Sequence, residues 1–447
     1  MQHYGNGPST GLDQTALGRI QTGFTSEDLF VSAADRAALR PLAERVAAIA
    51  ASDRMQEVRR HWYEVNSLKR TRPVIFCDPE NGWNEIITET QMKCRGKLAR
   101  RWEMDLRKEI FWGEVMGDEK PVEPFFDISV TVAPDDWGLA PVFTKTETLG
   151  SYVWDAPLKD YETDLKKLHS PQFAIDWKTT NGCLELAREI LEGGSRPGQG
   201  VLGVRLKPVW WWSLGLTLQA ALLRGLNNIL YDFVDHPREL KELLSLISKG
   251  HLEKLDYLQA NNLLRLNNDG TYVGSGGYGF TDQLPQPDFG GRVRTGDLWG
   301  FTESQETVSV SPDMYAEFIF PYEKPIMERF GLTCYGCCEP LDARWQVVRQ
   351  HHNLRRVSCS PWANLEKMVG YVEDRYILSI KPSPASIADS TPNWEAIRAA
   401  LRRTFELTRG CVVEVIMKDN HTLGQRPENA VTWCAMAREE ADRAWKG

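Results

Sequence analysis

The chain lacks an excess of positive charge, and it lacks an apolar run of membrane-spanning length. Its 447 residues include 53 Lys and Arg against 61 Asp and Glu, for a formal charge of −8. A protein that binds nucleic acid needs a concentrated positive face, so this balance argues against a nucleic-acid partner. The most apolar stretch, PVWWWSLGLTLQAALLRG, is interrupted by Ser213, Thr217 and Gln219, so we expect no membrane helix.

The chain also lacks a secretory leader and an ordered set of cysteines. No basic and apolar segment with a cleavage site opens the sequence, and the nine cysteines have no regular spacing. A disulfide framework is therefore not expected, and we predict a cytoplasmic protein with reduced thiols. Tryptophan, in contrast, is abundant: sixteen residues favour a pocket for a flat or apolar ligand.

The second half of the chain alternates short apolar runs with amphipathic helices. Several helices have recognisable start and stop residues, such as Ser311 and Pro312 before one helix and Gly331 after it. Strands of this length alternating with helices predict βα units and a parallel sheet. With the earlier apolar runs included, we predict eight strands, at residues 72–78, 126–134, 200–207, 298–303, 332–337, 355–360, 375–381 and 411–418.

Eight such strands predict an α/β protein with a TIM (β/α)8 barrel. Residues 1–70 are expected to form an arm and a helical extension, with helix from Ser32 to about Leu68, and residues 71–447 the barrel with long early insertions. A doubly wound sheet would show a glycine-rich phosphate loop after an early strand, and none is there. The closest segment, GSGGYG at 274–279, lacks the required spacing, and we interpret it as a flexible loop that could act as a lid.

In a TIM barrel the reacting groups come from the carboxyl ends of the strands. Polar residues follow the apolar runs in six or seven places, which predicts a polar mouth on the barrel. The residues are Asp78 and Glu80; Lys207 and Trp210–Trp212; Glu303 and Gln305; Tyr335, Cys337, Cys338 and Glu339; Cys359; Lys381; and Lys418, Asp419 and His421.

Three cysteines and a glutamate stand close together in TCYGCCE, residues 333–339. The alternation of side chains along a strand places Tyr335 and Cys337 on one face, with Cys338 on the other face or in the turn. Buried packing is one interpretation, because free cysteine is among the most buried residue types. The other is zinc bound by cysteine thiolates, with a further ligand that would be Glu339 or, from another strand, Cys411, His421 or Glu303.

Other strand-end residues suit substrate binding or acid–base chemistry. His421 could be an acid, a base or a ligand, or an ordinary loop histidine. Lys381 could hold a substrate carboxylate, and Asp78 could bind a polar substrate or face solvent. The predicted catalytic residues are Tyr335, Glu339, Lys381, His421 and Asp78. The predicted substrate-binding residues are two tryptophans that would wall a pocket and four polar residues: Trp210, Trp211, Glu303, Gln305, Lys418 and Asp419.

Several long stretches resemble the uroporphyrinogen decarboxylase superfamily, which includes corrinoid methyltransferases. The resemblance rests on WSLGLTLQAALLRGLNNILYDFVDHPRELKELL, VSVSPDMYAEFIFPYEKPIMERFG, TCYGCCEPLD and RVSCSPWANLEKMVGYVEDRYILSIKPSPASIA, in that order. It implies a TIM barrel and, in the methyltransferase branch, zinc held by a His-x-Cys pair and a later cysteine. The matching positions are Tyr335, Cys337 and Cys411, so tyrosine stands where the branch has histidine. The site then uses either another set, such as Cys337, Cys338 or Glu339 with His421, or no zinc.

The resemblance implies two activities. The leading hypothesis is methyl transfer between a cobamide-bearing partner protein and a small acceptor, with Cys337, Cys338 and Glu339 as the metal or thiol centre. The alternative is metal-free decarboxylation of a carboxylated aromatic or tetrapyrrole-like substrate, held by Lys381, Lys418, Tyr335 and Asp78. The arginine-rich signature of the decarboxylases is absent from RTRPVIFCDPENGW. A non-catalytic protein that binds a corrinoid or tetrapyrrole is a third hypothesis.

Overall fold

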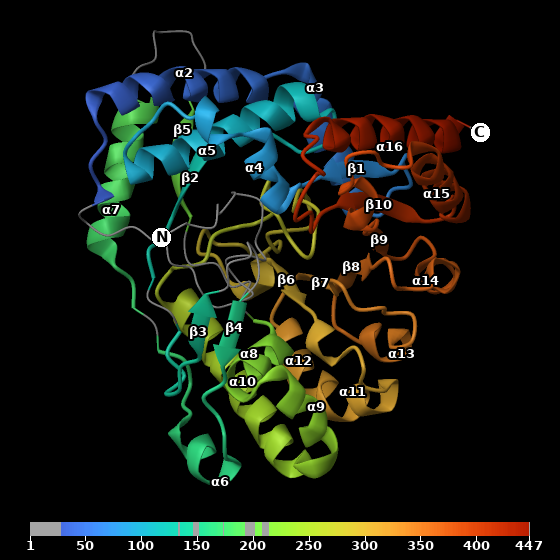
Figure 1. Ribbon diagram of the computed structural model, residues 1–447. Helices are drawn as coiled ribbons and strands as arrows, with labels where there is room; N and C mark the ends of the chain where they lie inside the picture. Colours follow the sequence, from blue (N-terminus) through green and yellow to red (C-terminus); the bar gives the residue numbers. More distant parts are fainter. Residues whose placement is uncertain are drawn as a thin grey trace.

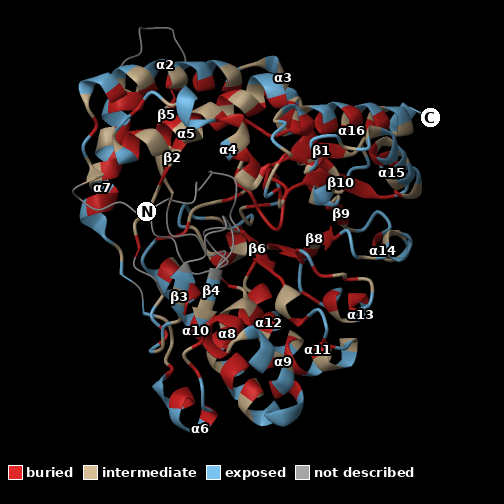
Figure 2. Cartoon of the chain, in the orientation of Figure 1, coloured by how far each residue is buried: buried red, intermediate tan, exposed pale blue. Residues whose placement is uncertain are grey.

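The computed structural model describes residues 28–132, 135–145, 152–172, 174–192, 202–207 and 214–446. Parallel strands with helices around them form the body of the molecule, and the N-terminal helices α2 and α3 lie along one side of it (Figure 1). Buried residues gather along the strands and on the inward faces of the helices (Figure 2). The fold is therefore mixed α/β with a parallel sheet, as the alternation of strands and helices predicts.

Six parallel strands form the main sheet, in the order β1-β10-β9-β8-β7-β6. The first strand of the chain pairs with the last, with Phe76 opposite Ile416. Nearly all strand residues are buried, and burial on both faces explains why the strands are mostly apolar in sequence. The charged exceptions are Arg355 and Arg356 in β8 and Glu414 in β10. The bounds are β1 Val74–Cys77, β6 Trp299–Thr302, β7 Leu332–Tyr335, β8 Leu354–Cys359, β9 Ile377–Ile380 and β10 Val412–Met417.

Two further sheets have two strands each. β2 (Phe125–Ser129) pairs in parallel with β5 (Gly203–Lys207), and β3 (Val142–Lys145) pairs antiparallel with β4 (Tyr152–Asp155). All eight predicted strands are therefore present, six in the main sheet and two in the β2–β5 pair. The β3–β4 hairpin was not predicted. Its strands have four residues each and expose Val142 and Val153, so they lack the buried apolar run that marks the others.

Residues 32–68, expected to be one helix, form two helices. α2 (Ala33–Ala50) ends at a break, and α3 (Asp53–Asn66) follows it. Ser32 caps α2 as predicted, because its hydroxyl accepts a hydrogen bond from the Asp35 backbone N–H. Ser52 caps α3 in the same way, through the Met55 N–H. The division of the chain into residues 1–70 and 71–447 stays a prediction.

Further helices precede the main run of sheet strands. They are α4 Trp83–Ile86, α5 Lys97–Phe111, α6 Tyr161–Asp164, α7 Trp177–Ala187, α8 Leu216–Arg224, α9 Leu226–Asp235 and α10 Pro237–Ala260. The sequence predicts one continuous helix where α8 and α9 lie. Gly225 separates them with a φ of 92°, a backbone conformation that interrupts a right-handed helix and that glycine adopts readily.

The C-terminal half alternates strands with six helices: α11 Pro312–Phe318, α12 Phe320–Met327, α13 Trp345–Val348, α14 Leu365–Val372, α15 Trp394–Leu407 and α16 Glu428–Lys446. Ser311 caps α11 as predicted. The helix expected at residues 341–350 is only the short α13. None of the helices within the described ranges has the length and apolar character needed to cross a membrane.

Both edges of the main sheet are satisfied by groups from the chain itself. At β1, the Glu119 carboxylate accepts from Ile75 N, and the Glu119 backbone N–H donates to Ile75 O. At β6, the Asn267 side chain donates to Trp299 O and accepts from Trp299 N. An open edge is a template for pairing with another chain, so these contacts protect the sheet against edge-to-edge association.

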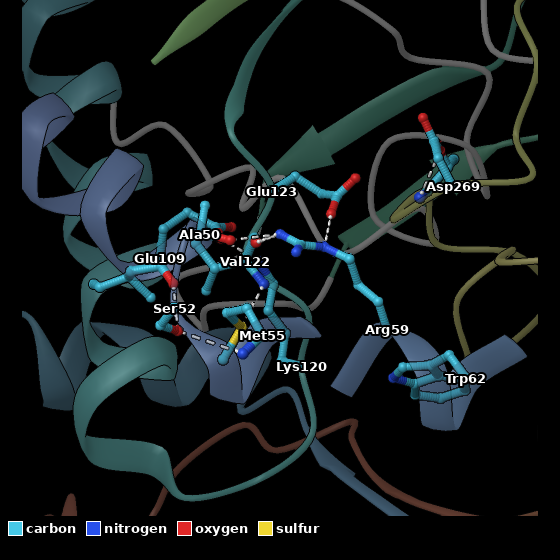
Figure 3. Close-up of polar contacts among 12 residues, drawn as sticks. Ala50, Ser52, Met55, Arg59, Trp62, Glu109, Lys120, Val122, Glu123 and Asp269 are labelled. Carbon is cyan, nitrogen blue, oxygen red and sulfur yellow. Dashed lines mark hydrogen bonds and ion pairs between the residues drawn. The ribbon is translucent and has the colours of Figure 1, made fainter. Parts of the chain in front are cut away.

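Arg59 of α3 ties the N-terminal helices to the segment that leads from β1 to β2. Its guanidinium donates to the Glu123 carboxylate at 2.9 Å and to the backbone carbonyls of Ala50 and Val122 at 2.8 and 2.9 Å (Figure 3). Hydrogen bonds from a charged donor are stronger than neutral ones. One side chain therefore holds the end of α2, the middle of α3 and the approach to β2 in a fixed arrangement.

The glycine-rich segment is buried at the centre of the fold, so its interpretation as a flexible lid was wrong. Residues 271–281 are all buried. The Trp299 indole of β6 donates to Gly279 O at 2.9 Å, and the Tyr278 ring packs edge-on against Phe76 of β1, with centroids 5.3 Å apart. Because β6 and β1 are the two edge strands, one segment that contacts both shows that the sheet curves around it.

Candidate functional site

Polar side chains at the carboxyl ends of the main-sheet strands form the candidate site. Neighbouring strands are parallel, so these ends lie on the same side of the sheet. Asp78 follows β1, Glu303 follows β6, Cys337 follows β7, Lys381 follows β9 and Lys418 follows β10, and all five are buried. With Glu80 and Glu339, we call them the strand-end site.

Two lysines supply the positive charge of the strand-end site. Burial disfavours the charge on Lys418, but nearby acidic groups, Asp419 first among them, outweigh burial and hold the pKa of Lys418 well above its usual value. Its Nζ lies 3.2 Å from Asp419 Oδ1 and 3.8 Å from Glu80 Oε1. Burial lowers the pKa of Lys381 to about 8, and Glu414 partly offsets this effect. Both side chains therefore carry positive charge at neutral pH, beside one another at the ends of adjacent strands.

Three glutamates of this region hold their protons to unusually high pH. Burial raises the pKa of Glu80 to about 8 although Lys418 opposes the shift. Burial also raises the pKa of Glu306 to about 7, and burial with the neighbouring Glu306 and Glu339 raises that of Glu303 well above its usual value. The Glu80 side chain keeps 24% of its surface exposed, so it can reach a bound molecule. A carboxylic acid that is protonated at neutral pH can act as a general acid.

Glu339 joins the ends of β6 and β7. One carboxylate oxygen accepts from Ser304 N at 2.9 Å, and the other accepts from Cys337 N at 2.8 Å. The side chain is almost fully buried, so these bonds satisfy both oxygens away from water. Glu339 is therefore placed to position Cys337, and its predicted catalytic role stays a prediction.

Tyr335 and Cys337 lie on opposite sides of the sheet, which corrects the expectation that they share a face. The Tyr335 hydroxyl bonds to Tyr315 of α11 at 2.8 Å and to Glu323 of α12 at 3.2 Å, behind the sheet. Cys337 instead contacts the glycine-rich segment inside it. Gly336 stands between them with a φ of 91°, so the strand alternation does not continue past Tyr335. Tyr335 is thereby removed from the group of residues that could touch a substrate.

The Cys337 thiol lies at the meeting point of the strand-end charges. The Ser275 hydroxyl donates to its sulfur at 3.1 Å, and the Cys338 sulfur is 3.6 Å away. The neighbouring Cys338 thiol and burial raise the pKa of Cys337 well above its usual value, while Lys418 opposes the shift. Because a thiolate and not a thiol is the nucleophile, this environment keeps Cys337 neutral and unreactive at neutral pH.

The structure does not assemble the zinc ligands that the sequence suggested. Cys411 stands just before β10, at the amino end of the strand, whereas Cys337 and Cys338 follow the carboxyl end of β7. His421 is exposed, and its Nδ1 lies 3.3 Å from Asn81 Nδ2. No group of three or more His, Cys, Asp or Glu side chains in the described part of the chain is arranged to hold a metal ion. The described residues therefore do not fit a zinc ion.

Several buried polar atoms at the strand ends have no hydrogen-bond partner among the described residues. Within the described ranges, five such atoms follow or end a main-sheet strand: Asp78 Oδ2, Thr302 Oγ1, Ser360 Oγ, Lys418 Nζ and Asn420 Oδ1. Buried polar atoms are almost always paired, because leaving one unpaired costs about 1–3 kcal/mol. A polar ligand at the strand ends would supply the missing partners.

Three residues near the site escaped the sequence analysis. Lys108 of α5 is buried, and its pKa is lowered by burial although Asp105 and Asp78 oppose the shift. Tyr272, from the glycine-rich segment, is buried close enough to Lys418 and Asp78 to interact with their charges. Thr302 ends β6 with an unpaired hydroxyl. Lys108 comes from a helix and Tyr272 from a loop, so neither could be predicted from the expectation that site residues follow strands.

The other predicted site residues have varied positions. Asp419 pairs with Lys418, and the Gln305 backbone N–H donates to the Glu303 carboxylate at 2.8 Å, so both lie at the strand ends. His421 follows β10 but faces solvent. Trp210 and Trp211 lie outside the residues that the structure describes. Their predicted role in walling a pocket stays a prediction.

The chain matches no family model and no curated protein sequence. Among solved structures it is similar to a methyltransferase from Methanosarcina mazei, with a TM-score of 0.47 and 11% sequence identity. The likeness covers 86% of this chain and 98% of that one. A likeness at this TM-score and sequence identity assigns neither a family nor an activity to the chain.

Proposed function

We propose that the chain is a methyltransferase that moves a methyl group between a small carboxylate-bearing molecule and a cobamide carried by a partner protein. The observation that carries the proposal is the set of buried polar atoms at the strand ends, Lys418 Nζ among them, that have no hydrogen-bond partner among the described residues. Convergent polar groups with shifted pKa values are typical of sites where chemistry takes place. The sequence resemblance to corrinoid methyltransferases supplies the reaction class.

The proposal includes a (β/α)8 barrel built from the eight parallel strands. The first strand pairs with the last, and the curved main sheet surrounds the glycine-rich segment. Asn267 covers the β6 edge through the Trp299 backbone. Two residues later, the Asp269 carboxylate accepts a hydrogen bond from Arg205 of β5. Strand β5 in turn pairs with β2. The β2–β5 pair would then fill the gap between β1 and β6, and its strands would complete the barrel around the site.

The two lysines would bind the substrate carboxylate. Lys381 and Lys418 extend from adjacent strands. The Lys418 ammonium group has no hydrogen-bond partner among the described residues, although the Asp419 carboxylate lies 3.2 Å and the Glu80 carboxyl group 3.8 Å away. A carboxylate placed between the lysines would give Lys418 the acceptor that it lacks. Pairing the negative charge with two buried cations would also orient the substrate for reaction.

Glu80 would act as the proton donor when the methyl group leaves an oxygen of the substrate. The C–O bond would break, the methyl group would pass to the cobamide, and the oxygen left behind would take the proton of Glu80. The cobamide would supply the electron pair that forms the new bond to the methyl carbon. Glu80 suits this role because its carboxyl is protonated at neutral pH and partly exposed beside Lys418. In the reverse direction, the Glu80 carboxylate would take the proton back.

Incubating the purified chain with reduced cobalamin and a panel of methoxylated aromatic acids tests the proposal. Formation of methylcobalamin, followed by its absorbance, together with an equal amount of demethylated acid, is the expected result. The same panel without cobalamin should release no carbon dioxide. Release of carbon dioxide with no methylcobalamin would overturn the proposal and favour the decarboxylase, in which Lys381, Lys418 and Asp78 hold the substrate.

A further inference from the structure

A cavity lies beside the amino end of β1, whereas the strand-end site is at the carboxyl ends of the strands. It has a volume of about 510 Å³ and is lined by residues of α3, of the segment 69–72 that leads into β1, and of α16. These two helices lie next to one another in Figure 1. We call the cavity the α3–α16 cleft. The methyl-transfer proposal uses none of its residues, so the role of the cleft does not depend on that proposal.

The α3–α16 cleft gathers cations that no carboxylate neutralises. Among the described residues, five basic side chains that line it form no ion pair: Arg54, Arg60, Arg70, Arg438 and Lys446. Arg70 donates only to the Arg409 carbonyl, and Arg60 and Lys446 are exposed. The whole chain has a net charge of −8, so a local surplus of positive charge runs against the average of the molecule.

The carboxylates that line the cleft do not cancel this surplus. Glu119 pairs with His61 and Arg72, and Asp442 also pairs with Arg72. Glu64 pairs with Lys69, and the buried Asp118 carboxylate accepts from the backbone N–H groups of Cys77 and Lys120. Within the described residues, Glu57 and Asp118 are the lining carboxylates that form no ion pair, and Asp118 is close enough to Arg54 to interact with its charge. Five cations without an ion pair therefore accompany two carboxylates without one.

Two arginines are held in place at the inner part of the cleft. Arg54 donates to the backbone carbonyls of Gly113 and Asp118 at 3.1 and 2.9 Å, and Arg438 donates to Gly117 O at 2.8 Å. Carbonyl partners orient the guanidinium groups and leave their charge uncompensated. Arg438 Nε is buried and has no acceptor within the described residues. A bound anion would give it one, as the rarity of unpaired buried donors leads us to expect.

We propose that the α3–α16 cleft binds the phosphate groups of a small phosphorylated molecule. Arginine suits phosphate because its planar group of N–H donors matches the phosphate oxygens, and several arginines together favour a multiply charged anion. Trp445, at the rim, is half exposed and offers a flat apolar surface. An organic phosphate with a ring, such as a nucleotide, would use both the cations and this indole.

Calorimetric titration of the full chain with ATP, with inorganic pyrophosphate and with adenosine tests the proposal. We expect saturable binding of both anions and none of uncharged adenosine. The double variant Arg60→Gln with Lys446→Gln removes two exposed cations without disturbing the interior, and it should weaken anion binding about tenfold or more. Arg349→Gln, which changes an exposed arginine outside the cleft, should leave the affinity unchanged.

The Trp445→Leu variant separates the two sources of phosphate. Weaker binding of ATP with unchanged binding of pyrophosphate would identify an organic phosphate with a ring as the ligand. If ATP and pyrophosphate bind equally tightly to the parent chain, and Trp445→Leu changes neither affinity, the ligand is an inorganic phosphate instead. The proposal is overturned if neither anion shows saturable binding, or if the double variant binds both anions as tightly as the parent chain does.

Discussion

Lys418 Nζ lies 3.8 Å from Glu80 Oε1, across the junction where the last strand of the chain pairs with the first. The contact joins a buried cation to a carboxyl group that keeps its proton to about pH 8. Burial pushes the pKa of Glu80 upward and Lys418 pulls it downward, so the two residues titrate together. This relationship gives the proposed active site a proton donor that works beside a substrate-binding cation.

The pH dependence of the reaction should follow the Glu80 carboxyl group. Because Glu80 must be protonated to donate, kcat for demethylation should be high below its pKa of about 8 and fall as the pH rises through that value. Glu80→Gln should lower kcat and abolish this fall. In Lys418→Met the cation that lowers the pKa of Glu80 is gone, so any residual activity should fall at a higher pH. If kcat of Lys418→Met falls at the same pH as kcat of the parent chain, Lys418 does not lower the pKa of Glu80.

Glu306 predicts a pH-dependent stability. Its pKa is raised to about 7 in the folded chain, chiefly by burial, so the proton that it holds stabilises the fold fully below its ordinary pKa. That contribution is lost as the pH rises through about 7. Glu306→Gln keeps an acceptor for the Thr217 hydroxyl, which donates at 2.7 Å, but never ionises. Its melting temperature should exceed that of the parent chain at pH 8 and match it at pH 4; a lower value at pH 8 would contradict the assignment.

Glu339→Ala should destabilise the chain by about 2–4 kcal/mol, because it leaves the buried N–H groups of Ser304 and Cys337 without acceptors. Glu339→Gln keeps one acceptor oxygen and should lose less. Urea unfolding at neutral pH measures both. Glu406→Ala, at an exposed position of α15, is the control and should change the free energy of unfolding by less than about 0.5 kcal/mol. Equal stability of Glu339→Ala and Glu406→Ala would show that Glu339 does not join the strands.

Two glycines give opposite predictions when each is replaced by alanine. Gly277 has a φ of 103°, and an added Cβ would lie 2.8 Å from Arg356 Cζ, so Gly277→Ala should cost about 1–3 kcal/mol. Gly370 lies within α14 with nothing inside 4 Å of an added Cβ, and Gly370→Ala should stabilise by about 0.5–1 kcal/mol. Denaturant unfolding compares them. A neutral Gly277→Ala would show that residues 271–281 are not packed at the centre of the sheet.

The strands could be predicted because burial on both faces leaves a clear mark on the sequence. The run VIFC is continuous and apolar, and VVEVIM is apolar except for Glu414. Polar residues follow directly after each of these strands. That rule correctly placed Asp78, Glu303, Cys337, Lys381 and Lys418 at one side of the main sheet. Their pairing could not be predicted, because the distance between Lys418 and Glu80 depends on the closure of β10 against β1.

Local backbone geometry explains the main errors. Gly336 ends the strand alternation after Tyr335, and the pattern of residue types cannot reveal its positive φ. Glycines are common in mobile loops, so GSGGYG was interpreted as one. In the fold they let the backbone pass close to strand residues, as the contact expected between a Cβ at Gly277 and Arg356 shows. The surplus of cations in the α3–α16 cleft was also hidden, because its residues come from distant parts of the chain.

The most direct test of the central claim is a single-turnover measurement of methyl transfer with Lys418 variants. Lys418→Met should reduce the rate at least a hundredfold, Lys418→Arg should retain part of it, and the exposed Lys249→Met should react like the parent chain. Circular dichroism establishes that each variant is folded. Methyl transfer at the parent rate by a folded Lys418→Met would contradict the claim that the strand ends around Lys418 are the site of the reaction.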